Sequence, residues 1–212
     1  RQGNFSQAAE QYTRALELSP NFVSARNRLG ITLNKLGRHA EATAQFSLAI
    51  KQEPTQAHLY NNLGFSQFLQ ERYQDACESY QQALQLKPEY HRARMNYGVV
   101  LAKLGHYTEA LTQFTLATSE SDAYFNLAVI CTEQGEYARA AQSLEKALAL
   151  NPNFDAARDQ LRLVAKLAAN DTPAVASRNG QQHTGKSHMQ SQHKFTSASG
   201  HEASMPPLPP SI

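Results

Sequence analysis

Histidines and acidic residues at close spacing are the first candidates for chemistry in this sequence. His106 and Glu109 stand three residues apart, a fragment of a known metal-binding pattern. Because His106 precedes Tyr107 in an expected turn, we interpret it as a solvent-exposed turn residue. The sequence contains no glycine-rich phosphate loop, no Gly-x-Ser-x-Gly motif and no His-Glu-x-x-His motif. It therefore predicts no enzyme activity, no cofactor and no metal site.

The two cysteines give the next candidates for reactive groups. Cys77 and Cys131 lie far apart, each within apolar sequence of helical character. We expect both to be buried as small hydrophobic residues, rather than to form a disulfide or a catalytic thiol. This cysteine usage favours a reducing cytoplasm. Because the chain begins at Arg1, a longer natural protein is expected, and a periplasmic or membrane-anchored location stays open.

Composition excludes several classes of partner. The 212 residues include 20 basic and 18 acidic residues, for a formal net charge of +2. That balance predicts no nucleic-acid ligand, since such binding needs clustered Lys and Arg. Hydrophobic residues make up 41% of the chain, which is typical of a folded protein. No run of 18 apolar residues occurs, so we expect no direct membrane span.

Prolines and alanines mark an internal repeat. Pro20, Pro54 and Pro88 are equally spaced, and Pro152 follows at two further intervals of the same length, less four residues. Alanine recurs in the same register, with a large side chain four residues later and another alanine three residues after that. These sets begin at Ala8, Ala42, Ala76, Ala110 and Ala140. Agreement at several independent positions predicts an array of stacked repeats.

The repeated residues resemble the tetratricopeptide repeat, whose pattern is Trp-x2-Leu-Gly-x2-Tyr followed by Ala-x3-Phe, Ala and Pro. Leu29-Gly30 and Leu63-Gly64 match its first part, and the resemblance extends from about Arg1 to Phe154. It implies an all-α fold, a right-handed superhelical solenoid of antiparallel helix pairs with a C-terminal capping helix. Small residues at the Gly30 position let the paired helices approach closely.

The register predicts the boundaries of the solenoid, which we expect over residues 1–169. Only the second helix of a first repeat is expected, within residues 1–22. Four repeats and an amphipathic capping helix follow, over residues 23–56, 57–90, 91–120, 121–154 and 155–169. The capping helix would cover the apolar face of the last repeat and keep the array soluble.

Three departures from the repeat pattern carry structural expectations. The repeat at 91–120 is four residues short and lacks its proline, so its second helix should be shorter or its connection tighter. Glu71 stands where the other repeats have a glycine between their helices, which predicts a turn without a left-handed residue. At the start of the chain, the Gly3-Asn4-Phe5 segment is expected to form the turn between the two helices of the first repeat.

Residues 170–212 are expected to form a disordered tail, since few large apolar residues remain and periodicity is lost. Four histidines, His183, His188, His193 and His201, offer metal ligands, but a flexible chain gives them no fixed geometry. The ending Met205–Ile212 is proline-rich and favours polyproline II. A solvated spacer is the preferred interpretation of that ending, and a ligand for an aromatic-lined groove remains the alternative.

The resemblance also implies a binding surface, because the family's concave face is lined by the first helix of each repeat. Asn62, Asn96 and Asn126 share one position in successive repeats, where family members that grip extended peptides use asparagine to bond the peptide backbone. Alternatively, the asparagines only tie adjacent helices together. The other predicted peptide contacts are Asn27, Asn61, Arg28, Ile31, Phe65, Arg92, Val99, Lys103 and Val129.

Charges on the same face predict a polarity for the ligand. Basic residues line its first part and acidic residues its far end, so an extended ligand with acidic residues toward the second to fourth repeats would fit. The residues concerned are Arg28, Lys35, Arg92, Lys103, Asp122 and Glu133. A branch of the family clamps a C-terminal carboxylate, but only Asn62 and, loosely, Arg92 match that clamp.

The sequence therefore predicts a protein-interaction scaffold or adaptor that binds an extended segment of a protein or peptide partner. Some of its stretches are similar to those of tetratricopeptide proteins of pilus, secretion and envelope assembly. A second hypothesis is the substrate-recruiting arm of a larger enzyme, such as a protein glycosyltransferase with its catalytic domain upstream. A third is a structural spacer that self-associates through the open face of the first repeat.

Overall fold

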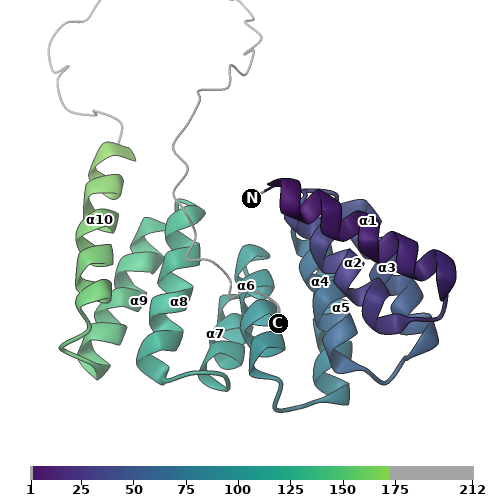
Figure 1. Cartoon of the computed structure of the whole chain (residues 1–212). Helices are drawn as coiled ribbons and strands as arrows, with labels where there is room; N and C mark the ends of the chain where they lie inside the picture. Colours follow the sequence, from purple (N-terminus) through teal and green to yellow (C-terminus); the bar gives the residue numbers. More distant parts are fainter. Residues whose placement is uncertain (1, 172–212) are drawn as a thin grey trace, which may run out of the picture. The chain divides into compact units, whose positions relative to one another are not determined.

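The computed structural model describes residues 2–171, which form ten α-helices and no β-strand (Figure 1). In chain order the helices are α1 (Gln2–Leu18), α2 (Val23–Lys35), α3 (His39–Gln52), α4 (Ala57–Phe68), α5 (Tyr73–Leu86), α6 (His91–Lys103), α7 (Tyr107–Thr115), α8 (Glu120–Glu133), α9 (Tyr137–Leu150) and α10 (Asp155–Asp171). The expected all-α helical repeat solenoid is confirmed.

Helix contacts show which side of the array is crowded. Each first helix packs against its own second helix, as in the pairs α2–α3, α4–α5, α6–α7 and α8–α9, and each second helix packs against the next first helix. The first helices also contact one another, from α2 through α4, α6 and α8 to α10. No two of the second helices α1, α3, α5, α7 and α9 come into contact. The array therefore bends toward its first helices, and we call the surface formed by α2, α4, α6 and α8 the first-helix face.

Glycines opposite aromatic rings allow each pair of helices to approach closely. A Cβ atom added to Gly98 would lie 2.5 Å from the Phe114 ring, and one added to Gly30 would lie 2.7 Å from Phe46. Both rings are fully buried. The last repeat uses Ala128 opposite Leu144 instead, and both side chains are again fully buried. The smaller leucine leaves room for the alanine methyl, so the pair keeps a close-packed interior.

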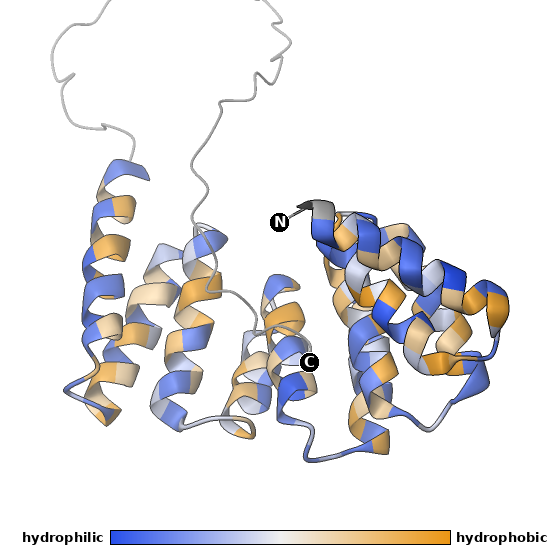
Figure 2. Cartoon of the chain, viewed as in Figure 1, coloured by the Kyte–Doolittle hydropathy of each residue, from blue (hydrophilic) through white to orange (hydrophobic). Residues whose placement is uncertain are grey.

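Hydropathy divides each helix between the interior and the solvent. Figure 2 shows hydrophobic and hydrophilic residues sharing the same helices. Such amphipathic helices gain most of their stability from packing their apolar stripes against neighbours. Among residues 2–171, no helix combines the length and the apolar character needed to cross a membrane.

Proline controls where the second helices end. The helices α1, α3, α5 and α9 each stop two residues before a proline, which cannot continue a helix. The helix α7, which lacks this proline, has 9 residues, whereas α3, α5 and α9 have 14. The connection after α7 still spans 116–119, as many residues as 53–56 after α3. The shortened repeat thus has a shorter second helix, which confirms one of the two expected outcomes.

Arginine side chains pin three of the proline turns, a feature the sequence interpretation missed. Arg26 donates to the carbonyl oxygen of Pro20 at 2.6 Å, and Arg94 donates to that of Pro88 at 2.5 Å. Arg158 repeats the contact on Pro152 at 2.6 Å. A charge-assisted bond of this kind fixes the chain between two repeats. The signal in the sequence is an arginine six residues after the proline.

The start of α1 differs from the expectation. The predicted turn at Gly3-Asn4-Phe5 is wrong, because these residues belong to α1, which begins at Gln2. Continuing the helix pairs backbone groups that a turn would leave open. At the other end, the capping helix α10 extends to Asp171, two residues beyond the expected 169.

The turn at Glu71 also corrects a prediction. Glu71 has φ 58°, in the same left-handed region as Gly37 at 75°, Gly105 at 83° and Gly135 at 77°. The tight connection between paired helices requires this conformation whatever residue occupies it. A side chain makes the left-handed region unfavourable by roughly 1–2 kcal/mol. Glu71 is therefore a strained position that the packing of α4 against α5 maintains.

Replacing Glu71 by glycine should relieve this strain. We expect Glu71→Gly to raise the free energy of unfolding by about 1 kcal/mol, because relief of the left-handed backbone outweighs the extra freedom of glycine in the unfolded chain. Urea unfolding followed by circular dichroism measures the change. Gly105→Glu is the matched control, since nothing lies within 4 Å of a Cβ added there, and it should be destabilising. A less stable Glu71→Gly variant would contradict the interpretation.

Candidate functional site

Helical spacing gathers the predicted contact residues on the first-helix face. On α2, Arg28, Ile31 and Lys35 stand at positions i, i+3 and i+7, which share one side of a helix. The same spacing on α6 aligns Asn96, Val99 and Lys103, with Arg92 one turn earlier. The equivalent stripe contains Asn62 and Phe65 on α4 and Leu69 directly after it. On α8 it contains Asn126, Val129 and Glu133.

An apolar row crosses this face from repeat to repeat. Ile31, Phe65, Val99 and Val129 occupy the same position in successive first helices, and all four are half-buried. Ile31 and Val99 pack against clusters of buried apolar residues. Phe65 and Val129 belong to none of the apolar clusters found among residues 2–171. Because they are partly exposed and lie outside the core clusters, we take these two side chains as the candidates for apolar contact with a ligand.

The asparagines form a chain of hydrogen bonds between repeats. The Asn96 Nδ2 group donates to Asn61 Oδ1 at 3.1 Å, and Asn61 Nδ2 donates to Asn62 Oδ1 at 3.2 Å. Asn62 Nδ2 in turn donates to Asn27 Oδ1 at 2.9 Å. Asn61, Asn62 and Asn96 are buried, with 3%, 9% and 8% of their surface exposed. The expected ladder of ligand-facing amides is thus wrong for Asn62 and Asn96, and the peptide contact expected of Asn61 is wrong as well, because these amides tie adjacent first helices together.

The burial of Asn62 and Asn96 depends on a partner asparagine in the preceding repeat. Asn62 faces Asn27, and Asn96 faces Asn61, each partner coming from the preceding repeat one position earlier in its helix. A buried amide is stabilised by such a hydrogen bond, so the two asparagines bond each other and not a ligand. For Asn126 the equivalent partner position holds Met95, whose thioether is a weak acceptor. Asn126 is half-buried, and its side-chain amide makes no hydrogen bond within residues 2–171, so this amide remains open to a ligand.

Two alanine substitutions separate these roles. Asn61→Ala removes an acceptor from Asn96 and a donor from Asn62, and we expect it to lower the free energy of unfolding by about 1–3 kcal/mol. Asn126→Ala removes no internal bond and should change stability by less than about 0.5 kcal/mol. Urea unfolding of both variants is the measurement. Equal effects at the two positions would contradict the assignment.

Three of the predicted charges have partners within the chain. Lys103 Nζ lies 2.7 Å from Glu133 Oε2, and the two side chains are only 18% and 23% exposed. Asp122 accepts hydrogen bonds from Ser119 and Thr118, and its backbone N–H donates to Ser119 Oγ at the start of α8. The predicted acidic end therefore does not stand free, because its carboxylates have partners.

The remaining cations on the face are Arg28, Lys35 and Arg92. Within residues 2–171, none of the three forms an ion pair with an acidic residue. Arg28 and Lys35 are exposed, and Arg92 is half-buried. Lys35 lies 5.1 Å from the centre of the Phe5 ring, which holds its ammonium near the N-terminal end of the face.

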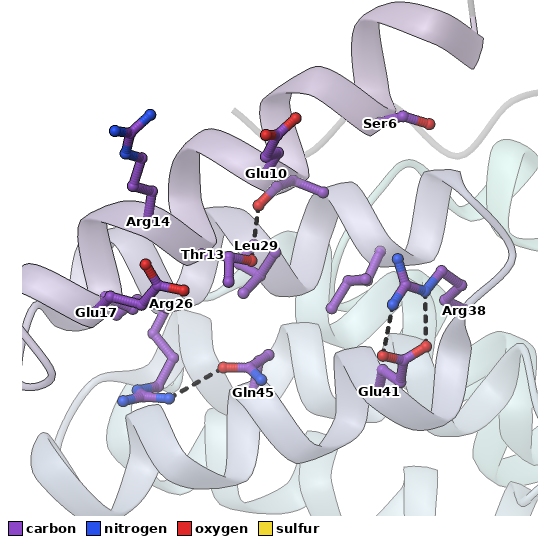
Figure 3. A pocket seen from close by; sticks show the side chains of 13 residues that line it. Ser6, Glu10, Thr13, Arg14, Glu17, Arg26, Leu29, Arg38, Glu41 and Gln45 are labelled. Atoms are coloured by element: carbon purple, nitrogen blue, oxygen red, sulfur yellow. Dashed lines mark hydrogen bonds and ion pairs between the residues drawn. The ribbon is translucent and has the colours of Figure 1, made fainter.

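A hollow lies on the opposite side of the array, where the second helices diverge. It has a volume of about 870 Å³ and is lined by α1, α2 and α3 (Figure 3). Arg38 and Glu41 form an ion pair at its rim, and Arg26 donates to Gln45 at 3.0 Å. None of the predicted peptide contacts lines it. Arg38 and Glu41 neutralise each other, whereas Glu10, Arg14 and Glu17 form no ion pair within residues 2–171.

Burial makes the two cysteine thiols unreactive. Both are free thiols, with Cys131 buried and Cys77 half-buried. Burial raises the pKa of Cys77 to about 11, and Glu78 adds to the shift. Burial likewise raises the pKa of Cys131 to about 11. Because the thiolate is the nucleophile, neither group is prepared for catalysis at neutral pH.

Thiol labelling tests this arrangement. A pKa raised from 9.0 to about 11 leaves about a hundredfold less thiolate at pH 8, so alkylation by iodoacetamide should be slower in the folded chain by at least about that factor. In urea both thiols should react at the ordinary rate. Mass spectrometry over time measures the rates. Rapid labelling of either cysteine in the folded chain would contradict the burial argument.

The histidine first considered for chemistry lies in a turn, as predicted. His106 precedes α7, and its Nδ1 atom is 4.0 Å from Glu109 Oε1, with both side chains more than half exposed. Among residues 2–171, no group of three or more histidine, cysteine or acidic side chains is placed to hold a metal ion. The four histidines after residue 180 and the proline-rich ending lie outside the described residues.

One face of α1 is less covered than its counterparts. Ala8, Tyr12 and Ala15 are half-buried, whereas Phe46 and its flanking alanines in the next repeat are fully buried. This is the open first-repeat face expected from the sequence. Self-association through it remains a proposal.

Comparison with known families identifies the repeat. A family profile described as "Tetratricopeptide repeat" matches residues 1–57 and 66–121, and a second profile of the same description matches 121–154. The chain belongs to the tetratricopeptide repeat family. None of the curated proteins compared with this tetratricopeptide protein matches it.

Solved structures agree with the family assignment. The tetratricopeptide chain superposes on MamA with a TM-score of 0.59 and 24% identity, over 77% of this chain and 92% of that one. YrrB, described as a TPR protein with an unusual peptide-binding site, gives a TM-score of 0.59 and 27% identity, over 77% and 84%. PilW, described as a widely conserved type IV pilus biogenesis factor, gives 0.53 and 23%, over 69% and 70%.

Family membership supports a role as a protein-interaction scaffold. The tetratricopeptide fold is typically a non-catalytic module whose stacked helices present an extended binding surface. Its partners are proteins or peptides. In this chain the first-helix face carries the apolar, amide and basic groups that such contacts use.

Proposed function

We propose that this tetratricopeptide protein binds an extended segment of a partner protein on its first-helix face. The observation that carries the proposal is the set of groups left without internal partners there. Phe65 and Val129 offer apolar surface outside the core clusters, and Asn126 offers an unpaired amide. An extended peptide has repeating N–H and C=O groups and alternating side chains that match such a surface.

The buried asparagine chain supports this function indirectly. It fixes the spacing of α2, α4 and α6 through bonds between repeats. A rigid surface binds with a smaller loss of conformational freedom than a flexible one. We therefore assign Asn27, Asn61, Asn62 and Asn96 to positioning the face, and Asn126 to contact with the ligand.

YrrB gives independent support, since it shares 27% identity with this chain and is described as having a peptide-binding site. The pilus, secretion or envelope assembly system expected from sequence remains a proposal, because PilW at 23% identity supports the fold alone. The alternative is a substrate-recruiting arm of a larger enzyme, such as a protein glycosyltransferase. The same face would serve that role.

Peptide selection tests the proposed surface. A random 12-residue peptide library displayed on phage is selected on the full chain, and enriched peptides are synthesised for fluorescence anisotropy. We expect Phe65→Ser/Val129→Ser to weaken their binding about tenfold or more, because each buried apolar side chain contributes on the order of 1.5–3 kcal/mol.

The matched control removes apolar surface from the second helices. Leu48 on α3 and Leu116 after α7 are 41% and 53% exposed, so Leu48→Ser/Leu116→Ser should leave peptide binding unchanged. Because Phe65 and Val129 are half-buried, Phe65→Ser/Val129→Ser should lower the melting temperature more than the control does, so circular dichroism must show both double variants folded at the assay temperature. Selected peptides that bind the Phe65→Ser/Val129→Ser chain as tightly as the parent would overturn the proposal.

A further inference from the structure

Basic residues are concentrated on the first helices in the N-terminal part of the array. The sequences of α2, α4 and α6 contain six Lys or Arg residues and no Asp or Glu. The second helices beside them, α1, α3 and α5, carry five acidic residues and two basic ones, namely Glu10, Glu17, Glu41, Asp75 and Glu78 against Arg14 and Lys51. A surface with charges of one sign attracts a ligand of the opposite sign.

Hydrogen bonds show which of the six cations face a ligand. Arg26 and Arg94 turn away from the face, because each donates to a proline carbonyl and to a glutamine on the second helix of its own pair. Lys103 is paired with Glu133. Arg28, Lys35 and Arg92 therefore supply the field of the first-helix face. Residues two positions apart on a helix point in nearly opposite directions, which is why Arg26 and Arg28 have different roles.

The helix between these cations, α4, contains no Lys, Arg, Asp or Glu. Partial desolvation lowers the pKa of its His58, although Glu53 opposes the shift. Phe65 and Leu69 give α4 an apolar stripe one turn long, and both are half-buried. A bound peptide that crosses α2, α4 and α6 in order would meet a cation on α2, then apolar surface, and then a cation on α6.

Resting on the proposed function, we infer that the segment bound here has side-chain carboxylates on both sides of a short apolar stretch. Arg28 would pair with one carboxylate and Arg92 with the other, while Phe65 and Leu69 receive the apolar side chains between them. Packed helices lie about 8–10 Å apart, so α2 and α6 are separated by about 16–20 Å. An extended chain covers that span in about five or six residues. The arginines can bind carboxylates bidentately.

Short defined peptides test the inference. The probe is a fluorescein-labelled peptide of ten residues, with two aspartates about six residues apart, two leucines between them, and serine and glycine elsewhere. Its C-terminus is amidated, so that only side-chain carboxylates carry negative charge. One comparison peptide replaces the aspartates by lysines, and another replaces the leucines by serines. Fluorescence anisotropy with the full chain gives the affinities at low and at high salt.

We expect the Asp–Leu peptide to bind at least about tenfold more tightly than the lysine peptide, with a difference that falls as salt is added. Arg28→Gln/Arg92→Gln should reduce this preference to about threefold or less. The control Arg14→Gln/Lys51→Gln removes the same charge from exposed positions on α1 and α3 and should leave the preference intact.

The outcomes separate the inference from the proposed function. If library-selected peptides depend on Phe65 and Val129, but the Asp–Leu and lysine peptides bind equally, the face binds peptides and the acidic preference is wrong. The inference is also overturned if the Asp–Leu peptide shows no binding at 1 mM, or if the two control substitutions remove the preference as fully as the face substitutions do. If no library-selected peptide loses affinity for the Phe65→Ser/Val129→Ser chain, the proposed function itself is rejected.

Discussion

The close approach of paired helices is the constraint on which the rest of this array depends. At Gly30, Gly64 and Gly98 the facing ring lies where a Cβ atom would be, within 2.5 to 2.9 Å. An aromatic residue and a glycine together fill the space that two medium side chains would fill elsewhere, so each pair behaves as one close-packed unit. In the last repeat the same space is filled by a larger small residue, Ala128, and a smaller large residue, Leu144. Stacking such units brings the first helices into contact and keeps the second helices apart.

Crowding of the first helices determines the chemistry of their shared face. Polar groups that lie between them lose water and must bond one another, as Asn96, Asn61, Asn62 and Asn27 do. Groups that lie outside the contact remain available, and these include Asn126, Phe65 and the unpaired arginines. The same repeat position can therefore hold an asparagine that stabilises the array in one unit and one that is open to a ligand in another. The partner residue in the preceding repeat decides between them.

The sequence predicted the repeat register, the helix pairs and the capping helix, because small residues, large residues and prolines recur at fixed spacing and each acts locally. It did not predict the features that depend on contacts between repeats. Asn62 and Asn96 share a position with Asn126, but their burial follows from neighbours in the preceding repeat. Lys103 and Glu133 likewise form a pair between two repeats. Glu71 takes a left-handed conformation because the connection imposes it, against the preference of its own side chain.

An array that is bent toward its first helices and basic over α2 and α6 matches the proposed scaffold for an extended acidic segment. The most direct measurement is a titration of the ¹⁵N-labelled 23.5 kDa chain with a library-selected peptide, followed by the NMR signals of the backbone and of the Asn126 side-chain amide. The account predicts that the shifts concentrate on α2, α4, α6 and α8 and include the Asn126 amide. Shifts confined to the second helices or to the hollow between α1 and α3 would contradict it.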